Sequence, residues 1–301
     1  MSDRKINDGS TKTNPEPQWK WKLDQYMLGK LVDPTNPNFK RWVKRDENYI
    51  SSHTAAAVQT LQNQFGSLRG LRIIDVGCGG GLDSINLARA GAVVTGIDIV
   101  PELIEIARIR AQEEGVHARF LAVDPRDEWH RPEQFDAAIA IDVLEHVEDP
   151  INLIKDCWSL LRPDGIAIFS TPNHWALSNV ISDPHWHLFG VTLLPRYIAK
   201  IYVTRIRRIL REYDVTKFIG LSRLRAMMLE QGFVLLYDNV IDAQEKLAVP
   251  SNINGNLKRL LAKATFSLAK IKRLRTLMSW LYCFAFTRTW QIVVKKSESR
   301  D

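Results

Sequence analysis

A glycine-rich run, IIDVGCGGG at residues 73–81, has the pattern Asp75-x-Gly77-x-Gly79-x-Gly81. Glycines at this spacing remove side chains where a ligand must approach the backbone closely. The apolar residues before them are typical of a buried strand. The run therefore predicts a loop that holds a nucleotide-like ligand between a strand and the helix that follows.

The residues around this loop narrow the choice of ligand. A dinucleotide fingerprint needs glycine or alanine where Leu82 stands, and no Lys-Ser/Thr pair follows the glycines as in a phosphate-binding P-loop. The carboxylate of Asp75 could attract an ammonium or sulfonium group. A ligand with a cationic amino-acid end fits better than a nicotinamide cofactor, so an oxidoreductase is disfavoured.

Two further acidic residues follow predicted strands. Asp98 lies about twenty residues beyond the loop, where a carboxylate can accept hydrogen bonds from ribose hydroxyls. Its alternative role is to cap the helix that starts near Pro101. Asp124 could accept a hydrogen bond from an adenine amino group, or it could be a turn residue before Pro125.

Strand-like and helix-like segments alternate around these residues. Strands are expected at 71–76, 92–99, 117–123, 135–142, 166–172, 233–242 and 289–296, and helices at 82–91, 101–115, 151–165 and 222–232. This alternation predicts an α/β fold with a doubly wound, mostly parallel seven-stranded sheet and helices on both faces.

Two longer segments interrupt the alternation, after the fifth and sixth strands. The segment 172–220 is expected to be a lid, and the segment 243–288 a basic amphipathic helical insertion. Both follow carboxyl ends of strands, where such a sheet binds its ligands; helical decoration unrelated to the ligand is the alternative. Residues 1–40 are expected to be a flexible tail, and 41–301 one domain that begins with a helical cap at 41–66.

Four ordered segments resemble the class I S-adenosylmethionine-dependent methyltransferases. They are IIDVGCGGG, VTGIDI, FDAAIAIDVLEHVEDP and LLRPDGIAIFSTPN. The resemblance implies a Rossmann-like fold and S-adenosylmethionine as the cofactor. The cofactor contacts that it implies are Asp75, Gly77, Cys78 and Gly79 at the methionine end, Asp98 and Ile99 at the ribose, Asp124 at the adenine, and Asp142 near the transferred methyl group.

The segment DVLEHVEDP is similar to one in the ubiquinone-pathway O-methyltransferases, where two acids and a histidine are associated with a divalent metal. The corresponding residues are Asp142, Glu145 and His146, and Mg²⁺ is the cation that this resemblance suggests. The related enzymes have glutamate in the place of Asp142, so a metal-free role for the segment stays open.

Three histidines are candidates for the catalytic base. His146 follows the fourth strand, and His185 and His187 lie in the expected lid beside Trp186 and Phe189, which could stack on a ring or a sugar. We expect methylation of oxygen on a small or lipid-linked acceptor, such as a quinone precursor, a phenol or a sugar-like hydroxyl. Methylation of nitrogen or carbon, and a non-catalytic cofactor-binding regulatory protein, are the alternatives.

The net charge of +7 is unevenly spread, because no acidic residue lies between Glu245 and Glu298. The basic and apolar segment 257–286 could lie on an anionic membrane surface, although its apolar run is too short to span a bilayer. A solvated positive face is the alternative, and binding to nucleic acid is disfavoured. Three widely spaced cysteines and no signal-peptide pattern favour the cytoplasm, with possible peripheral membrane association.

Overall fold

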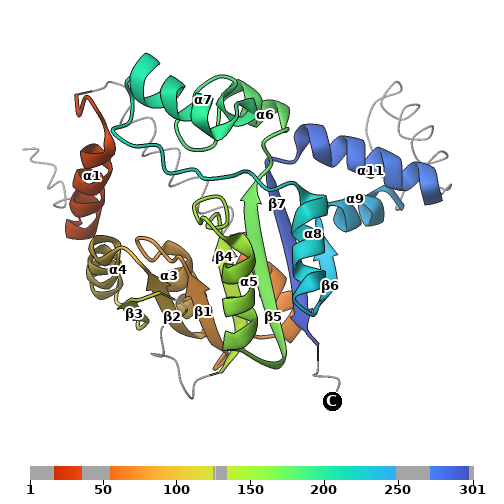
Figure 1. Cartoon of the computed structure of the whole chain (residues 1–301). Coiled ribbons are helices and arrows are strands. Elements are labelled where there is room, and N and C mark those ends of the chain that lie inside the picture. The colour runs from red at the N-terminus through yellow and green to blue at the C-terminus, as the bar shows by residue number, and fades with distance from the viewer. Residues whose placement is uncertain (1–16, 36–54, 125, 127–133, 249–271, 298–301) are drawn as a thin grey trace, which may run out of the picture.

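The computed structural model describes residues 17–35, 55–124, 126, 134–248 and 272–297. Its centre is a seven-stranded sheet in the order β3-β2-β1-β4-β5-β7-β6 (Figure 1). The strands are β1 (Arg72–Val76), β2 (Val93–Asp98), β3 (Arg119–Ala122), β4 (Phe135–Ile141), β5 (Leu161–Pro172), β6 (Phe233–Asp238) and β7 (Thr289–Lys296). Only β7 runs antiparallel to its neighbours, β5 and β6, within this sheet. The predicted mostly parallel sheet of seven strands is confirmed.

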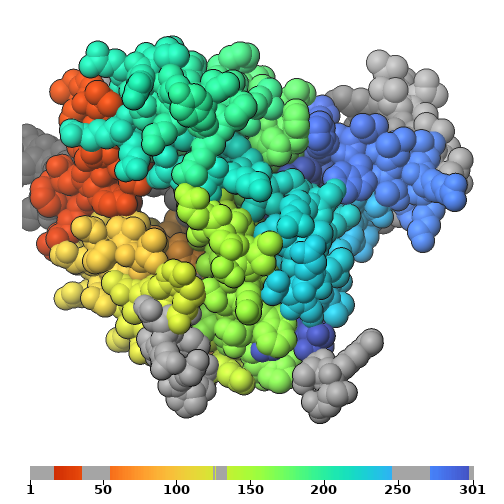
Figure 2. Space-filling view, viewed as in Figure 1, coloured from red at the N-terminus to blue at the C-terminus, as the bar shows by residue number. Residues whose placement is uncertain are grey.

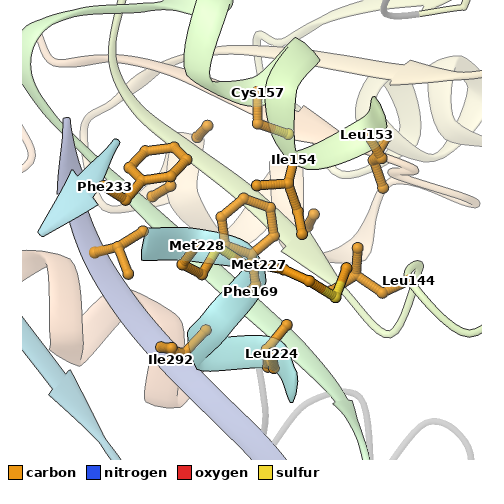
Figure 3. Packing of buried hydrophobic residues seen from close by; sticks show 14 of the residues in the cluster. Leu144, Leu153, Ile154, Cys157, Phe169, Leu224, Met227, Met228, Phe233 and Ile292 are labelled. Atoms are coloured by element: carbon orange, nitrogen blue, oxygen red, sulfur yellow. The ribbon is translucent and has the colours of Figure 1, made fainter. Parts of the chain in front are cut away.

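Helices cover both faces of the sheet. They include α3 (Leu82–Arg89), α4 (Pro101–Glu113), α5 (Pro150–Leu160) and α8 (Leu221–Glu230). Figure 3 shows how Ile154 of α5 and Leu224 of α8 pack around Phe169 of β5 on one face. On the other face, Leu61 and Leu87 pack with Ile73 of β1. The carboxyl ends of the parallel strands thus meet at one edge between two apolar layers, where ligands are expected to bind.

Two predicted boundaries differ from the structure. β5 begins at Leu161 rather than at residue 166, because Leu161 already pairs with Phe135 ahead of an irregularity in the β4–β5 register. β6 ends at Asp238 rather than at residue 242. The Asp238 carboxylate accepts hydrogen bonds from the backbone N–H groups of Val240 and Ile241, and α9 (Asn239–Ala248) begins there.

The prediction of a flexible tail through residue 40 is wrong for α1 (Gln18–Lys30). This helix packs on α4, where the Arg110 guanidinium lies 4.0 Å from the centre of the Trp19 ring. Lys22 and Glu105 form an ion pair of 2.6 Å at the same contact. Within the expected cap, residues 55–65 are helical, and Ala57 is buried against the sheet with Leu61; residues 41–54 lie outside the described residues.

The two insertions follow the carboxyl ends of β5 and β6 and contact each other, because the Trp175 ring of the first stacks on the Phe284 ring of the second (Figure 1). We call residues 173–220 the lid; it contains α6 (Leu177–Ile181), the short turn η2 (Val191–Leu193), α7 (Arg196–Ile201) and η3 (Tyr202–Ile206). The lid has its own apolar cluster, which includes Leu31 from the end of α1. The second insertion contains α9 and α11 (Lys272–Phe286), with residues 249–271 outside the described ones. None of the helices in the described ranges is long and apolar enough to cross a membrane.

Candidate active site

The glycine loop lies at the carboxyl end of β1, held by β2. The backbone N–H groups of Gly77 and Cys78 donate to the carbonyl of Ile97, at 2.8 and 3.0 Å. Gly77 has φ +76°, and a Cβ there would lie 2.5 Å from Cγ2 of Val143. Gly79 also has a positive φ, of +50°, but its Cβ position faces open space. The loop therefore needs glycine for two different reasons: close approach at Gly77 and backbone conformation at Gly79.

Asp98 joins this loop to the end of β2. Its carboxylate accepts hydrogen bonds from the N–H of Gly79 at 3.0 Å and from the N–H of Val100 at 2.9 Å. Each oxygen keeps a second acceptor position for a ribose hydroxyl. The neighbouring Ile99 side chain is 69% exposed beside it. These positions suit the roles predicted for Asp98 and Ile99.

Asp75 and Cys78 are more enclosed than their predicted roles suggest. Asp75 is buried and accepts a hydrogen bond of 2.6 Å from the Ser84 hydroxyl. Burial, with repulsion from Asp83 and Asp98, raises the pKa of Asp75 to about 8. Its carboxyl group is therefore mostly neutral at pH 7 and attracts a cation only weakly. Burial also raises the pKa of the Cys78 thiol well above its ordinary value, so this cysteine is a poor nucleophile.

Asp124 is held by its own turn. Its carboxylate accepts hydrogen bonds from the backbone N–H of Arg126 at 2.9 Å and from the Arg126 side chain at 2.6 and 2.8 Å. The hydrogen bond with this side chain lowers the pKa of Asp124. This geometry favours the turn role that was the alternative to adenine recognition.

Three candidate residues meet beyond the end of β4. The ligand atoms of Glu145, His146 and His185 all lie within 4.8 Å of one another, and we call these three residues the Glu145 cluster. The rings of His146 and His185 meet edge to face with their centres 5.2 Å apart. Nε2 of His185 is 3.8 Å from Oε1 of Glu145. The lid thus supplies one of the three side chains.

The ends of β4 and β5 hold the cluster in place. Asp142 has φ +54°, and its Oδ1 accepts a hydrogen bond of 2.9 Å from the Ser170 hydroxyl. The hydroxyl of Thr171, the next residue of β5, donates to Oε2 of Glu145 at 3.1 Å. From the lid, the N–H and hydroxyl of Thr216 donate to the Glu145 carbonyl at 2.7 and 2.9 Å.

Burial disfavours the charged forms of two members of the cluster, Glu145 and His146. Burial, with repulsion from Asp142, raises the pKa of Glu145 well above its ordinary value. Burial and the neighbouring His185 lower the pKa of His146 to about 4. Oε1 of Glu145 is buried and has no hydrogen-bond partner among the described residues. A proton or a cation bound at this oxygen would compensate for its burial.

Other candidates lie outside the cluster. His187 has φ +56°, and its Nδ1 lies 3.4 Å from the Ser182 hydroxyl, within the lid. Asp142 is near the cluster but is not one of the three residues that could share a cation. Figure 2 shows an opening on the surface. It lies between α1, the part of the chain from β1 to α4, the segment after β4 and the lid.

Sequence reasoning missed Asp214 and Lys30. The carbonyl oxygen of Asp214 lies 3.4 Å from Nδ1 of His146, and its carboxylate lies 3.2 Å from Nζ of Lys30 at the end of α1. No motif marks either residue in the sequence. Through these two contacts, Asp214 of the lid links α1 to the Glu145 cluster.

Residues 45–237, well over half of the chain, match the family model of a methyltransferase domain. The chain belongs to the class I S-adenosylmethionine-dependent methyltransferases. The predicted family, enzyme class, Rossmann-like fold and S-adenosylmethionine cofactor are thereby confirmed.

Relatives and solved structures agree with this family. The methyltransferase is 34% identical over 197 residues to the ubiquinone biosynthesis O-methyltransferase of Bordetella bronchiseptica, an alignment that covers 64% of this chain and 75% of that one. It is 42% identical over 118 residues to the enzyme of that name from Actinobacillus pleuropneumoniae, covering 38% of this chain but only 50% of the relative. Magnesium protoporphyrin IX methyltransferase from Synechocystis PCC 6803 shares the fold, with 20% identity and a TM-score of 0.52 over 93% of this chain and 95% of that one.

Proposed function

We propose that the methyltransferase transfers the methyl group of S-adenosylmethionine to a phenolic oxygen of a quinone precursor. The Glu145 cluster carries this proposal, because it places a carboxyl group and two imidazoles beyond the end of β4. Attack by oxygen on a sulfonium methyl group needs in-line positioning and removal of the hydroxyl proton. The similarity to O-methyltransferases of ubiquinone biosynthesis supports oxygen as the acceptor atom.

His185 is the base that fits best among the three predicted histidines. His146 is held neutral by burial, and its pKa of about 4 makes it a weak proton acceptor. The His185 side chain is 19% exposed and its Nε2 lies 3.8 Å from Oε1 of Glu145, so this imidazole can meet an acceptor hydroxyl at the cluster. His187 lies outside the cluster and is assigned no catalytic role.

The same cluster suits a divalent cation. One carboxylate and two imidazoles within 4.8 Å fit Zn²⁺ or Mn²⁺ better than the Mg²⁺ expected from the sequence. The unpartnered Oε1 of Glu145 is a free ligand atom for such an ion. The ligands would be Glu145, His146 and His185, with Asp142 next to them. A bound cation would lower the pKa of a hydroxyl acceptor.

The test compares His185→Ala with His187→Ala, a matched control from the same loop. With a catechol as acceptor, we expect His185→Ala to lower kcat by ~100-fold or more and His187→Ala to stay near wild type. Binding of S-adenosylhomocysteine, measured by calorimetry, should be unchanged in both. Equal effects of the two substitutions would contradict the assignment of His185.

The same assay identifies the atom that is methylated and tests whether activity needs a metal. Mass spectrometry and NMR locate the new methyl group, and methylation of nitrogen or carbon alone would contradict the proposal. Loss of activity in EDTA, restored by Mn²⁺ or Zn²⁺, would assign the cluster to metal binding; unchanged activity would assign it to base catalysis. A protein that binds S-adenosylhomocysteine but methylates no acceptor would favour the regulatory alternative.

A membrane surface is the partner we propose for the second insertion. Of the predicted segment 257–286, residues 272–286 are described and form α11. Lys272 and Arg273 are exposed at its start, and Leu281 and Tyr282 are exposed further along it. Basic and apolar residues together suit contact with anionic lipids. An acceptor carried in a membrane would then be within reach of the enzyme.

A further inference from the structure

A cavity of about 380 Å³ lies within the lid. Its volume falls in the range of sites that hold small molecules. Thr216 lies at its boundary with the Glu145 cluster: it lines the cavity, and its N–H and hydroxyl donate to the Glu145 carbonyl. The three side chains of the cluster do not line the cavity, so it is a separate space that the proposed methyl transfer does not use.

The charged side chains that line the cavity are both cationic. They are Arg196 and Lys217, and no acidic residue of the described ranges lines it. Arg196 is paired with Glu148 at 3.1 Å, whereas the exposed Lys217 side chain has neither an ion pair nor a hydrogen bond with any described residue. Asp214, three positions before Lys217, is itself paired with Lys30 at 3.2 Å. The Lys217 ammonium is therefore available to a negatively charged ligand.

Two further side chains of the lining can donate hydrogen bonds to a ligand. Nδ1 of His174 is buried without a partner among the described residues, and burial lowers the pKa of this histidine, so its ring is neutral at pH 7. Burial raises the pKa of the Tyr213 hydroxyl, which keeps its proton at pH 7. The Thr192 hydroxyl is engaged elsewhere, because it donates to the His174 carbonyl at 3.1 Å. An acceptor oxygen in the cavity would give His174, in the tautomer with its proton on Nδ1, the partner that it lacks.

Flat and aliphatic side chains make up most of the remaining lining. The rings of His174 and Phe218 stack with their centres 5.9 Å apart and 22° between their planes. Trp175, which is 46% exposed, lies against His174 with ring centres 5.0 Å apart. Leu194 and Val215 add aliphatic surface. These side chains offer apolar surface on which a flat ring can be buried next to the cationic and donor groups.

We propose that this cavity binds a small aromatic carboxylate, at a site separate from that of methyl transfer. The carboxylate pairs with Lys217 and accepts a hydrogen bond from His174, and the ring lies against Phe218 and Trp175. A neutral molecule of the same shape would leave the ammonium and the buried nitrogen without a partner. An inorganic anion would leave the apolar lining in contact with water. The inference does not depend on the proposed function, because this binding is independent of which atom is methylated.

The test uses 2-naphthoate and 2-naphthamide, two molecules of nearly the same shape that differ in charge. Binding of each to the full chain saturated with S-adenosylhomocysteine is measured by calorimetry. We expect 2-naphthoate to bind at least ~10-fold more tightly than the amide. Lys217→Gln should reduce the affinity for 2-naphthoate at least ~10-fold and leave the affinity for 2-naphthamide unchanged. Lys200→Gln is the matched control, because Lys200 is exposed on α7 of the same lid and does not line the cavity.

His174→Phe provides a second variant, which keeps a flat ring at this position and removes Nδ1. It should lower the affinity for 2-naphthoate at least ~3-fold while S-adenosylhomocysteine still binds as in wild type. His185→Ala, in the Glu145 cluster, should leave the binding of 2-naphthoate unchanged.

Three results would overturn the inference. The first is that wild type binds 2-naphthoate no more tightly than 2-naphthamide, or does not bind it at millimolar concentration. The second is that Lys217→Gln and Lys200→Gln bind 2-naphthoate equally well. The third is that His185→Ala abolishes binding, which would place the anion at the Glu145 cluster.

Discussion

Gly77 of the glycine loop lies directly against Val143 in the segment after β4. We expect Gly77→Ala to lower the free energy of unfolding by about 2–4 kcal/mol, since it adds a clash with Val143 to the strain of a positive φ. Gly115→Ala is the control, because Gly115 has φ +65° with open space around its Cβ position. That change should cost about 1 kcal/mol. Urea denaturation of both variants measures the difference, and equal losses would mean that the Val143 contact is easily relieved.

The raised pKa of Asp75 makes the free energy of unfolding depend on pH. Its pKa is about 8 in the folded protein and 3.8 in an unfolded chain, so the folded state binds the proton more tightly. The stabilisation is complete below pH 3.8 and is lost as the pH rises toward 8. Asp75→Asn should remove this loss, which amounts to roughly 5 kcal/mol between pH 4 and pH 8.

Urea denaturation of the cofactor-free protein at several pH values measures this effect. Carboxyl groups that do not interact with Asp75 are present in both proteins, so their contributions cancel in the difference; Asp83 and Asp98 do interact with Asp75, and their contributions change with it. Parallel stability curves for wild type and Asp75→Asn would show that the carboxyl group is ionised at its ordinary pKa.

Helix α1 connects the cofactor half of the enzyme to the lid. Leu23 of α1 lies near Gly80 of the glycine loop, and Leu31 is fully buried in the lid cluster, where it pairs with Leu210. Leu31→Ala should lower the free energy of unfolding by roughly 2–4 kcal/mol and speed the release of S-adenosylhomocysteine. Stopped-flow measurement of release is the decisive readout, with the half-buried Val32→Ala as control. An unchanged release rate would mean that α1 does not enclose the cofactor.

Helix α11 predicts binding to anionic lipid. The double substitution Leu281→Glu with Tyr282→Glu places negative charge on two side chains that are about 60% exposed, at 61% and 58%. Co-sedimentation with vesicles that contain an anionic phospholipid should fall at least severalfold, because both the apolar and the electrostatic contributions are weakened. Vesicles of phosphatidylcholine alone serve as the comparison. Equal sedimentation of wild type and variant would place any lipid contact elsewhere.

S-adenosylhomocysteine, the product that the cofactor leaves after methyl transfer, should stabilise the whole molecule against unfolding. S-adenosylhomocysteine at 100 times its Kd should raise the free energy of unfolding by about 2.7 kcal/mol. Asp98→Ala, which removes the carboxylate that accepts from Gly79 and Val100, should lose most of this gain at the same ligand concentration. Thermal denaturation with and without the ligand measures both. A full gain in the variant would remove Asp98 from the cofactor site.

The sequence predicted the sheet and the cofactor loop well, because their signals are local. Apolar runs next to glycines mark β1 and β2, and β7 was placed at its observed bounds. The end of β6 was misplaced because the capping carboxylate of Asp238 outweighs the β propensity of the residues after it. The sequence named His185 and His187 equally as candidate bases from the lid. It did not indicate that His185 is the one that joins Glu145 and His146. The Lys30–Asp214 contact joins residues 184 positions apart with no motif at either end, so tertiary packing alone determines it.

Strand β7 has a further consequence for biosynthesis. It lies between β5 and β6, although it follows both in the chain, and it pairs with β5 from Ile166 to Pro172. During translation the edge of β5 therefore stays open until residue 296 has left the ribosome. At ~5–20 residues per second this takes roughly 6–25 s after β5 emerges. An apolar strand edge exposed for that time is a site where nascent chains can associate, so a chaperone that binds the growing polypeptide should raise the yield of native enzyme.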